Sequence, residues 1–302
     1  MLRLSSRRAR LLLATGLFSC VAWAVLRRPG WNTDARPRHL THIPAEVLFD
    51  DLGDIVRVGP SRLIVVRFLG PVDLVPMTFE QCGLKAPAPI GDYAERLSAP
   101  ILFNAGQFDA NLRYLGWLKG RGQWLSQSRK SGWQGLLVTT PASTPTMTPE
   151  TQAQRPYGQI LDLETLAGQD AQSEANAYDN VVQSMMLLDD DARVRVRRST
   201  RAACRTVVAQ DDQGRLLILA SEGAVTLYDL AQWLSQSSLH ITRAMNLDGG
   251  VESQLAITTP ELKLLLYGQY GTESQLFGPR AGGAGAPLPM VVAAFPRGDT
   301  TP

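Results

Sequence analysis

The sequence has 302 residues, of which 44% are hydrophobic and 19% are charged, and its formal net charge is +2. These values are typical of one globular domain with a sizeable core. Arginines near the N-terminus supply more than the net positive charge, so the rest of the chain is close to neutral. A near-neutral body gives no basis for nucleic-acid binding, and we expect no nucleic-acid partner.

Residues 1–28 predict an address outside the cytoplasm. Four arginines lie within residues 3–10, and residues 11–26 form an uncharged, largely apolar run. A basic head followed by such a run is typical of a signal peptide or a membrane anchor, and the excess of arginines before the run places the body outside. The alternative is a buried core helix. We expect a periplasmic or other extracytoplasmic protein, which is either released or held in the inner membrane by residues 11–26.

The folded domain is expected over residues 46–296, after a proline- and histidine-containing linker over 29–45 and before a short tail over 297–302. Leu63–Val66 is a continuous apolar run, which predicts a strand covered on both faces. Pro71–Pro76 predicts an edge strand because of its prolines. The other elements expected here are strands over 50–57, 62–69 and 101–103 and a short helix over 93–98.

The second half of the domain predicts many strands and one clear helix. Thr226 and Asp229 have capping-box spacing, and apolar residues with helical periodicity follow them. Residues 139–156 predict a surface loop, either a lid over a site or an uninvolved insertion, and residues 169–180 predict irregular structure. The strands expected here cover 135–138, 158–163, 181–188, 205–209, 216–220, 244–247, 253–258, 262–267 and 289–295. Short strands with few helices predict an α+β fold around a mixed or largely antiparallel sheet.

Residues 192–198 alternate valine with arginine, which predicts a half-buried strand with an arginine face. A solvated edge strand would explain this face, because charges on an edge block unwanted pairing. Attraction of phosphate is the alternative explanation.

Three cysteines are present, and Cys20 lies in the N-terminal segment. Cys82 and Cys204 could form one disulfide in an oxidising compartment or remain two buried thiols. The sequence contains no Cys-x-x-Cys motif, which argues against a thiolate zinc site.

Asp248 is the main candidate functional residue. It follows a short apolar strand and precedes Gly249 and Gly250, which permit positive φ and close backbone approach. In isolation the motif would predict a tight hairpin turn. A second carboxylate, Glu252, and a second strand-end motif, Asn104-Ala105-Gly106, favour a functional site. Asn104 alone would predict only an Asn-initiated turn.

The segment Asn246-Leu247-Asp248-Gly249-Gly250 resembles the signature of the phosphodiester glycosidase family. The family usually continues Gly-Ser-Ser, whereas this chain has Val251-Glu252-Ser253. Asn104–Gly106 resembles a second family motif, and Arg205-Thr206 matches an Arg-Thr pair that opens a hairpin in the same order along the chain. The resemblance implies hydrolysis of a glycosyl phosphodiester in an envelope or extracellular glycan.

The resemblance also implies roles for the motif residues. Arg205 would hold the phosphate, Asp248 would act as nucleophile or base, and Glu252 would do acid or base work. The residues expected to bind or orient the sugar are Asn104, Gly106, Thr206, Gly249, Gly250 and Ser253. We expect no obligatory cofactor, although an oxygen-ligated divalent cation such as calcium at Asp248 remains an alternative.

Other chemistries are disfavoured. The histidines are His39, His42 and His240; the first two lie in the linker, and His240 follows the predicted helix without a serine elbow nearby. A Ser-His-Asp hydrolase and a histidine metal site are therefore not expected. The second function class is a non-catalytic glycan-binding module on the same fold, which Val251 and Gln107 favour because they depart from the family motifs.

Overall fold

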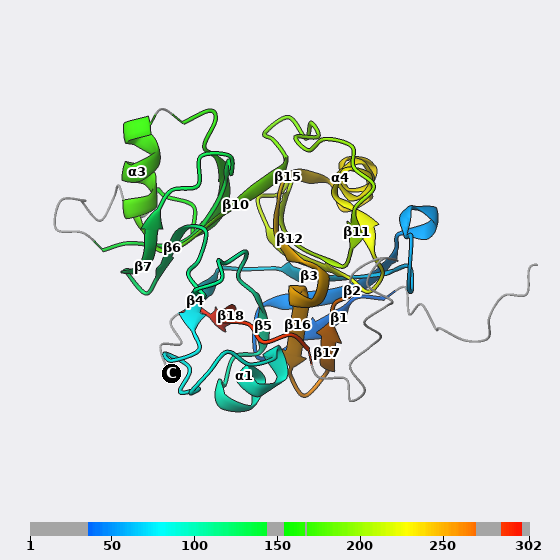
Figure 1. Cartoon of the computed structure of the whole chain (residues 1–302), viewed down its shortest axis with the longest axis horizontal. Coiled ribbons are helices and arrows are strands. Elements are labelled where there is room, and N and C mark those ends of the chain that lie inside the picture. The colour runs from blue at the N-terminus through cyan, green and yellow to red at the C-terminus, as the bar shows by residue number, and fades with distance from the viewer. Residues whose placement is uncertain (1–35, 144–153, 167, 270–284, 298–302) are drawn as a thin grey trace, which may run out of the picture. The chain divides into compact units, whose positions relative to one another are not determined.

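The computed structural model describes residues 36–143, 154–166, 168–269 and 285–297. All of them belong to the unit Asp34–Pro302, whereas the unit Met1–Thr33, with the predicted signal or anchor segment, lies outside the described residues. Two large sheets form the framework (Figure 1), and every pairing between described strands is antiparallel. The predicted α+β class with a largely antiparallel sheet is confirmed.

The larger sheet runs in the spatial order β1-β2-β3-β13-β12-β15-β10-β6-β7, with β8 also pairing β10 and β9 pairing β8. Its strands are β1 (Arg38–Leu40), β2 (Ala45–Asp51), β3 (Arg62–Phe68), β6 (Gly116–Gly120), β7 (Gln123–Ser128), β8 (Gly135–Pro141), β9 (Gly158–Asp162), β10 (Tyr178–Leu188), β12 (Arg205–Asp211), β13 (Leu216–Ser221) and β15 (Ile241–Gly249).

The smaller sheet runs in the order β17-β16-β5-β18-β4, and a short pair, β11 and β14, stands apart. These strands are β4 (Val72–Thr78), β5 (Ile101–Asn104), β11 (Ala202–Ala203), β14 (Val225–Thr226), β16 (Gln254–Thr258), β17 (Lys263–Tyr267) and β18 (Met290–Pro296). The helices of the described residues are α1 (Ile90–Arg96), α3 (Gly168–Asn176) and α4 (Leu227–Gln236), with 3-10 turns η1 (Gly53–Ile55) and η2 (Gly250–Glu252).

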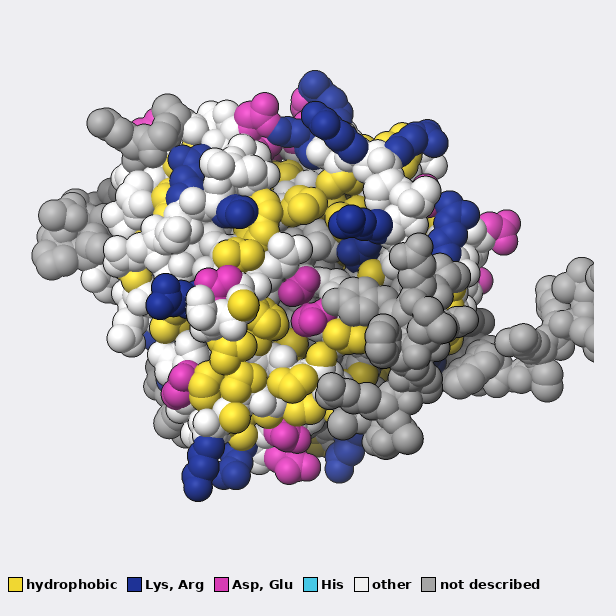
Figure 2. Space-filling model, viewed as in Figure 1, with side chains coloured by type: hydrophobic (Ala, Val, Ile, Leu, Met, Phe, Trp, Pro, Cys, Tyr) yellow, Lys and Arg dark blue, Asp and Glu magenta, His cyan; other side chains and the backbone are white. Residues whose placement is uncertain are grey.

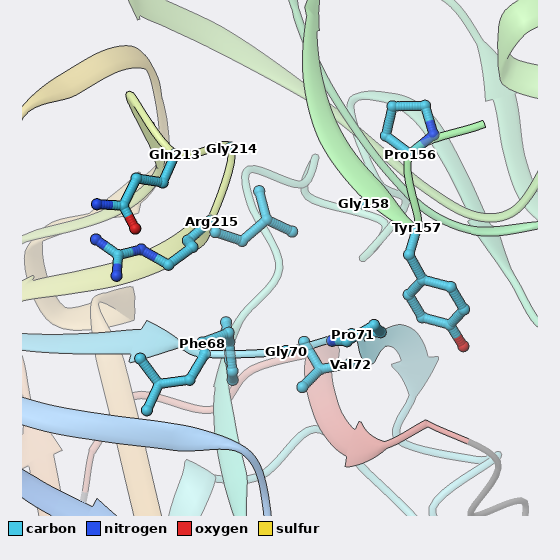
Figure 3. Close-up of a pocket in the computed structure, with 12 residues that line it drawn as sticks. Phe68, Gly70, Pro71, Val72, Pro156, Tyr157, Gly158, Gln213, Gly214 and Arg215 are labelled. Atoms are coloured by element: carbon cyan, nitrogen blue, oxygen red, sulfur yellow. The ribbon is translucent and has the colours of Figure 1, made fainter. Parts of the chain in front are cut away.

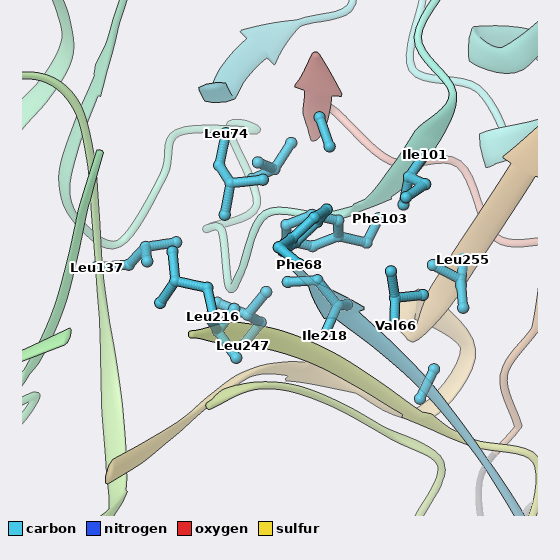
Figure 4. Close-up of a cluster of buried hydrophobic side chains, with 14 of the residues drawn as sticks. Val66, Phe68, Leu74, Ile101, Phe103, Leu137, Leu216, Ile218, Leu247 and Leu255 are labelled. Atoms are coloured by element: carbon cyan, nitrogen blue, oxygen red, sulfur yellow. The ribbon is translucent and has the colours of Figure 1, made fainter. Parts of the chain in front are cut away.

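The main core lies between the two sheets (Figure 4). Phe68 and Ile218 of the larger sheet pack in one buried cluster with Phe103 and Leu255 of the smaller sheet. Burying a side chain of this size contributes about 1.5–3 kcal/mol. This packing fixes the ends of the two sheets relative to one another, and the candidate site lies where those ends meet.

The outer faces of the sheets are covered as well. Leu63 and Val65 of β3 point into a cluster with α4, while Ile64 and Val66 point into the main core. The prediction of a strand covered on both faces is thus confirmed. The α4 helix begins where the capping box predicted, because the Thr226 hydroxyl accepts a hydrogen bond from the Asp229 amide. Pro76 of β4 is consistent with the predicted edge position, since β4 is the edge strand of the smaller sheet.

Several predicted elements were wrong. The strand over 50–57 starts earlier, as β2, and ends where Gly53 takes a φ of +55°. The range predicted as a linker contains β1, which pairs with β2. Residues 169–180 hold α3, because Ala171 and Ala175 form a small apolar stripe that packs beneath Tyr178. Strands β6 and β7 were not predicted, since glycines and polar residues obscure their pattern.

Residues 192–198 are not a strand. They make a single bridge, Leu188 to Val194, and Val194 and Val196 pack against the α4 side of the larger sheet. Arg195 turns toward acidic residues, so the arginines do not share one solvated face. The predicted loop over 139–156 is described only at its ends; β8 occupies its start, and residues 144–153 lie outside the described residues.

Of the two alternatives for these cysteines, the structure shows the second: Cys82 and Cys204 are free, buried thiols and do not form a disulfide. Cys82 packs in the cluster beneath α1, whereas Cys204 is fully buried at the start of β12 and its Sγ donates to the Glu222 carbonyl at 3.2 Å. Burial raises the pKa of Cys82 to about 12 and that of Cys204 to about 11. Among the described residues, none of the helices has the length and apolar character needed to cross a membrane.

Candidate functional site

Asp248 lies in an irregular stretch at the end of β15, opposite the first residue of β12. Arg205 pairs with Gly249 and Val207 pairs with Asn246, so β15 carries one more residue than β12 between these two pairs. A bulge of this kind bends the strand and redirects a side chain. The irregularity therefore falls on the Leu247-Asp248 step and sets the direction of the carboxylate.

The Asp248 carboxyl is held in an environment that favours its neutral form. Burial, as the largest effect, raises its pKa to about 6; the Glu252 charge raises it further, while the Gly249 amide and the Arg205 charge lower it. The Gly249 amide donates to Asp248 Oδ1 at 2.8 Å. The site thus contains one carboxylate whose pKa lies close to neutral pH, which is typical of an acid–base or nucleophilic group.

Arg205 lies directly against the backbone of Gly249. A Cβ on Gly249 would stand 2.8 Å from Arg205 Nη1 and 2.9 Å from the Cys204 carbonyl oxygen, so only glycine fits there. Two carbonyls orient the guanidinium: Nε donates to Val225 O and Nη2 donates to Arg201 O, both at 3.2 Å. The cation is therefore fixed beside Asp248. The effect of the Arg205 charge, which lowers the pKa of Asp248, also indicates that the two groups are close.

Asn104 links the smaller sheet to the Asp248 loop. Its Oδ1 accepts from the Gln254 amide at 3.1 Å, and its Nδ2 donates to the Asp248 carbonyl at 3.5 Å. The side chain is only 1% exposed. Asn104 is thus placed to hold the backbone of Asp248 in position. Both polar atoms of its side chain form hydrogen bonds with backbone groups.

Thr206 and Ser253 form a second internal link. Their hydroxyl oxygens are 2.8 Å apart, and both residues are fully buried. They connect β12 with the segment that follows η2. In this structure both hydroxyls face one another inside the protein, behind the Asp248 loop.

Tyr114 belongs to the site and was not predicted. A Cβ on Gly106 would stand 2.6 Å from the Tyr114 hydroxyl oxygen, so Gly106 makes room for this ring. The hydroxyl donates to the Gln183 carbonyl at 2.7 Å, and burial together with the Asp248 charge raises its pKa. Asp109 closes the turn that returns the chain to Tyr114, because its Oδ1 accepts from the amides of Asn111 and Arg113. The sequence signal was this Asp-initiated turn directly after the Asn-Ala-Gly motif.

The turn after Asp248 has its own requirements. Gly250 takes a φ of +76°, and its amide donates to the Cys204 carbonyl at 2.9 Å. A Cβ on Gly268 would stand 2.1 Å from the Gly250 carbonyl oxygen, so the chain after β17 braces this turn. Glu252 lies in η2 and is half-buried, close enough for its charge to act on Asp248. Gly268 was not predicted because a lone glycine after a strand carries no distinctive pattern.

Within the described residues, no group of three or more His, Cys, Asp or Glu side chains is arranged to hold a metal ion. His240 follows α4 with a φ of +55°, and His39 Nδ1 lies 3.9 Å from a Glu46 carboxylate oxygen. Acidic and basic side chains are interspersed on the face shown in Figure 2, in keeping with the near-neutral composition.

Comparison with known proteins identifies the family. The phosphodiester glycosidase model matches residues 121–283, more than half of the chain, and this range contains Arg205, Asp248 and Glu252. No curated protein sequence gives a match.

Two solved structures show the same fold. The catalytic domain of zebrafish N-acetylglucosamine-1-phosphodiester alpha-N-acetylglucosaminidase, auto-inhibited by its pro-peptide, has a TM-score of 0.58 at 14% identity and covers 87% of each chain. A hypothetical protein from Synechocystis has a TM-score of 0.50 at 18% identity and covers 84% of this chain and 62% of its own. The chain therefore belongs to the phosphodiester glycosidase family and is a hydrolase of the glycosidase type.

Proposed function

We propose that this protein is an exported hydrolase that cleaves a glycosyl-phosphodiester bond in an envelope or extracellular glycan. The observation that carries the proposal is the fixed pair of Asp248 and Arg205 at one end of the larger sheet. A carboxylate and a guanidinium held side by side match the two charged centres of such a substrate, the anomeric carbon and the phosphate.

In the proposed reaction, the phosphate leaves from the anomeric carbon as a weak base and needs little protonation. Arg205 holds the phosphate oxygens, and its orientation by two backbone carbonyls supports a defined bidentate grip. Ionised Asp248 supports the positive charge that develops on the sugar, as nucleophile or as base. Glu252 acts as the second carboxylate.

The remaining motif residues have supporting roles in this proposal. Gly106 makes room for the Tyr114 ring, Gly249 makes room for the Arg205 guanidinium, and Gly250 supplies the positive φ of the turn after Asp248. Asn104, Thr206 and Ser253 position the loop that carries Asp248, since their polar atoms are bonded within the protein. No step requires a metal ion or an organic cofactor.

The Asp248→Asn variant tests the assignment. Turnover should fall by several orders of magnitude, as expected for loss of a catalytic group. The melting temperature at pH 7 should rise, because burial opposes the ionisation of Asp248 in the folded protein. Its raised pKa stabilises the fold below pH 3.8, and this contribution is lost as the pH rises through about 6.

Turnover is measured as sugar release from the methyl phosphodiester of N-acetylglucosamine 1-phosphate. If the wild-type protein does not hydrolyse this ester, the corresponding esters of other sugars are assayed. Asp54→Asn, an exposed aspartate in η1, is the matched control. A folded and fully active Asp248→Asn protein would remove Asp248 from the mechanism. Wild-type protein that binds these esters without releasing sugar would instead support the glycan-binding alternative.

The export proposal rests on residues 1–28 and has a separate test. A reporter enzyme that is active only outside the cytoplasm, fused after Pro302, should be active in cells. Deletion of residues 1–28 should abolish that activity, and a fusion that is active only with a cytoplasmic reporter would contradict export.

A further inference from the structure

A cleft of about 520 Å³ opens beside the candidate site. Its apolar lining includes Met185, Val196 and Leu227. Its polar lining consists of Gln134, Glu164, Arg195, Arg197 and Ser199. The volume lies in the range of ligand pockets, about 300–1,000 Å³, and the lining offers both apolar and charged groups to a ligand.

Strand register places this cleft next to Asp248 and Arg205. Met185 of β10 pairs directly with Asn246 of β15, two residues before Asp248. Directly paired residues of antiparallel strands project from the same face of a sheet. On the other side, Leu227 stands two residues after Val225, whose carbonyl oxygen accepts a hydrogen bond from Arg205 Nε. The cleft therefore adjoins the residues proposed to hold the phosphate.

Arg197 is the distinctive residue of the cleft. No carboxylate of the described residues lies within ion-pair distance of it. Its neighbour Arg195, by contrast, pairs with Asp162 at 3.0 Å and contacts Glu164 and Asp189. The structure thus satisfies one arginine internally and leaves the next one available to a ligand.

A second pocket shows that this is not a general property of arginines in hollows. The pocket in Figure 3, of about 240 Å³, contains Arg215. There the guanidinium Nε is 2.7 Å from a carboxylate oxygen of Asp211, whose side chain is fully buried. Arg215 has a structural partner, whereas Arg197 has none among the described residues.

Asn246 gives an independent indication. It is 2% exposed, its Nδ2 donates to the Leu247 carbonyl, and its Oδ1 has no hydrogen-bond partner among the described residues. A buried acceptor without a partner is costly, by roughly 1–3 kcal/mol, unless water or a ligand satisfies it. Because Asn246 projects from the same sheet face as Met185, the unsatisfied oxygen lies on the side of the cleft.

We propose that this cleft binds the leaving group of the substrate and that Arg197 binds a further phosphate carried by that leaving group. The inference rests on the proposed glycosyl-phosphodiester activity. The apolar lining accommodates the carbon skeleton of the alcohol, and the Arg197 guanidinium pairs with the second phosphate, as it would in a substrate built from repeating sugar phosphates. The substrate class is then a sugar-1-phosphodiester whose alcohol is itself phosphorylated.

Two substrates that differ only in the alcohol test this proposal with the full chain. One is the methyl ester of N-acetylglucosamine 1-phosphate, and the other carries glycerol 3-phosphate in place of methanol. The wild-type protein should prefer the second substrate by about tenfold or more in kcat/KM, the scale of one charge-assisted hydrogen bond. Arg197→Gln should reduce this preference to near unity, and Arg197→Lys should retain part of it.

Arg198→Gln is the matched control, because Arg198 stacks on Tyr228 with its guanidinium carbon 4.4 Å from the ring centroid and does not line the cleft. This variant should keep the wild-type preference, and melting temperatures establish that all variants are folded. An Arg197→Gln protein that keeps the preference, or a wild-type protein that shows none, overturns the proposal.

Failure of the proposed function would look different, since the wild type would then release sugar from neither ester. In that case, binding of glycerol 3-phosphate to the wild-type and Arg197→Gln proteins is titrated to test whether the cleft holds an anion. Saturable binding that Arg197→Gln abolishes supports an anion site in the cleft, and equal or absent binding by the two proteins overturns it.

Discussion

Single residues of the candidate site make contacts that their motifs do not predict in isolation. Asp248 and Arg205 were predicted from a strand-end Asp-Gly-Gly and an Arg-Thr pair, and the structure brings these two residues together. Asn104, Thr206 and Ser253 were predicted to meet the sugar, yet their polar atoms bond within the protein. A sequence shows that a polar residue follows a strand, but only packing decides whether that residue faces solvent or a neighbouring backbone.

The pKa of Asp248 predicts how activity depends on pH. If ionised Asp248 is required, kcat/KM should rise with pH through an apparent pKa of about 6. Glu252→Gln should move this limb to lower pH, because the Glu252 charge raises the pKa of Asp248. A pH–rate profile of the wild type, of Glu252→Gln and of Asp54→Asn makes the measurement. If the limb stays at the same pH in Glu252→Gln, the charge of Glu252 does not influence the ionisation of Asp248.

The regular elements were predictable where the hydrophobic period is clean. The β12–β13 hairpin and α4 follow their patterns closely, because each has one or two well-defined apolar faces. β15 was predicted only over residues 244–247 and is longer at both ends. The pattern failed at α3, whose buried face consists of alanines, and at residues 192–198, where valines anchor a loop to a core without pairing as a strand. In both places tertiary contacts override the local signal.

The brace on the Asp248 turn gives a prediction for an element. In Gly268→Ala, the new Cβ would collide with the carbonyl oxygens of Gly250 and Ser253, so the turn must shift. We expect a loss of stability of about 1–3 kcal/mol together with reduced turnover.

Chemical denaturation and sugar release measure these two effects in parallel. Gly132→Ala is the stability control, because a Cβ at that position has no atom within 4 Å. Wild-type stability in Gly268→Ala would show that the turn does not depend on this brace.

For the whole molecule, the free thiols give a third prediction. Cys82 and Cys204 are both buried and are not joined by a disulfide, so a reducing agent should leave the melting temperature unchanged. Thiol labelling without a reductant should modify both residues after denaturation and neither in the folded state, since burial raises the pKa of each. Peptide mass spectrometry reads out each site separately, and a peptide linking Cys82 to Cys204 would contradict the structure.

The packing of the two sheets has a consequence for how the protein becomes active. Asn104 lies on β5 of the smaller sheet. It forms hydrogen bonds with Asp248 and Gln254, which are 144 and 150 positions further along the chain. Contacts between such distant segments form late in folding, because the entropy lost in closing a long loop precedes the stability that the contacts contribute. A chain that has folded either sheet alone holds only half of the site. The candidate site is therefore completed only when the two sheets dock, and a partly folded chain lacks the arrangement that the proposed hydrolysis requires.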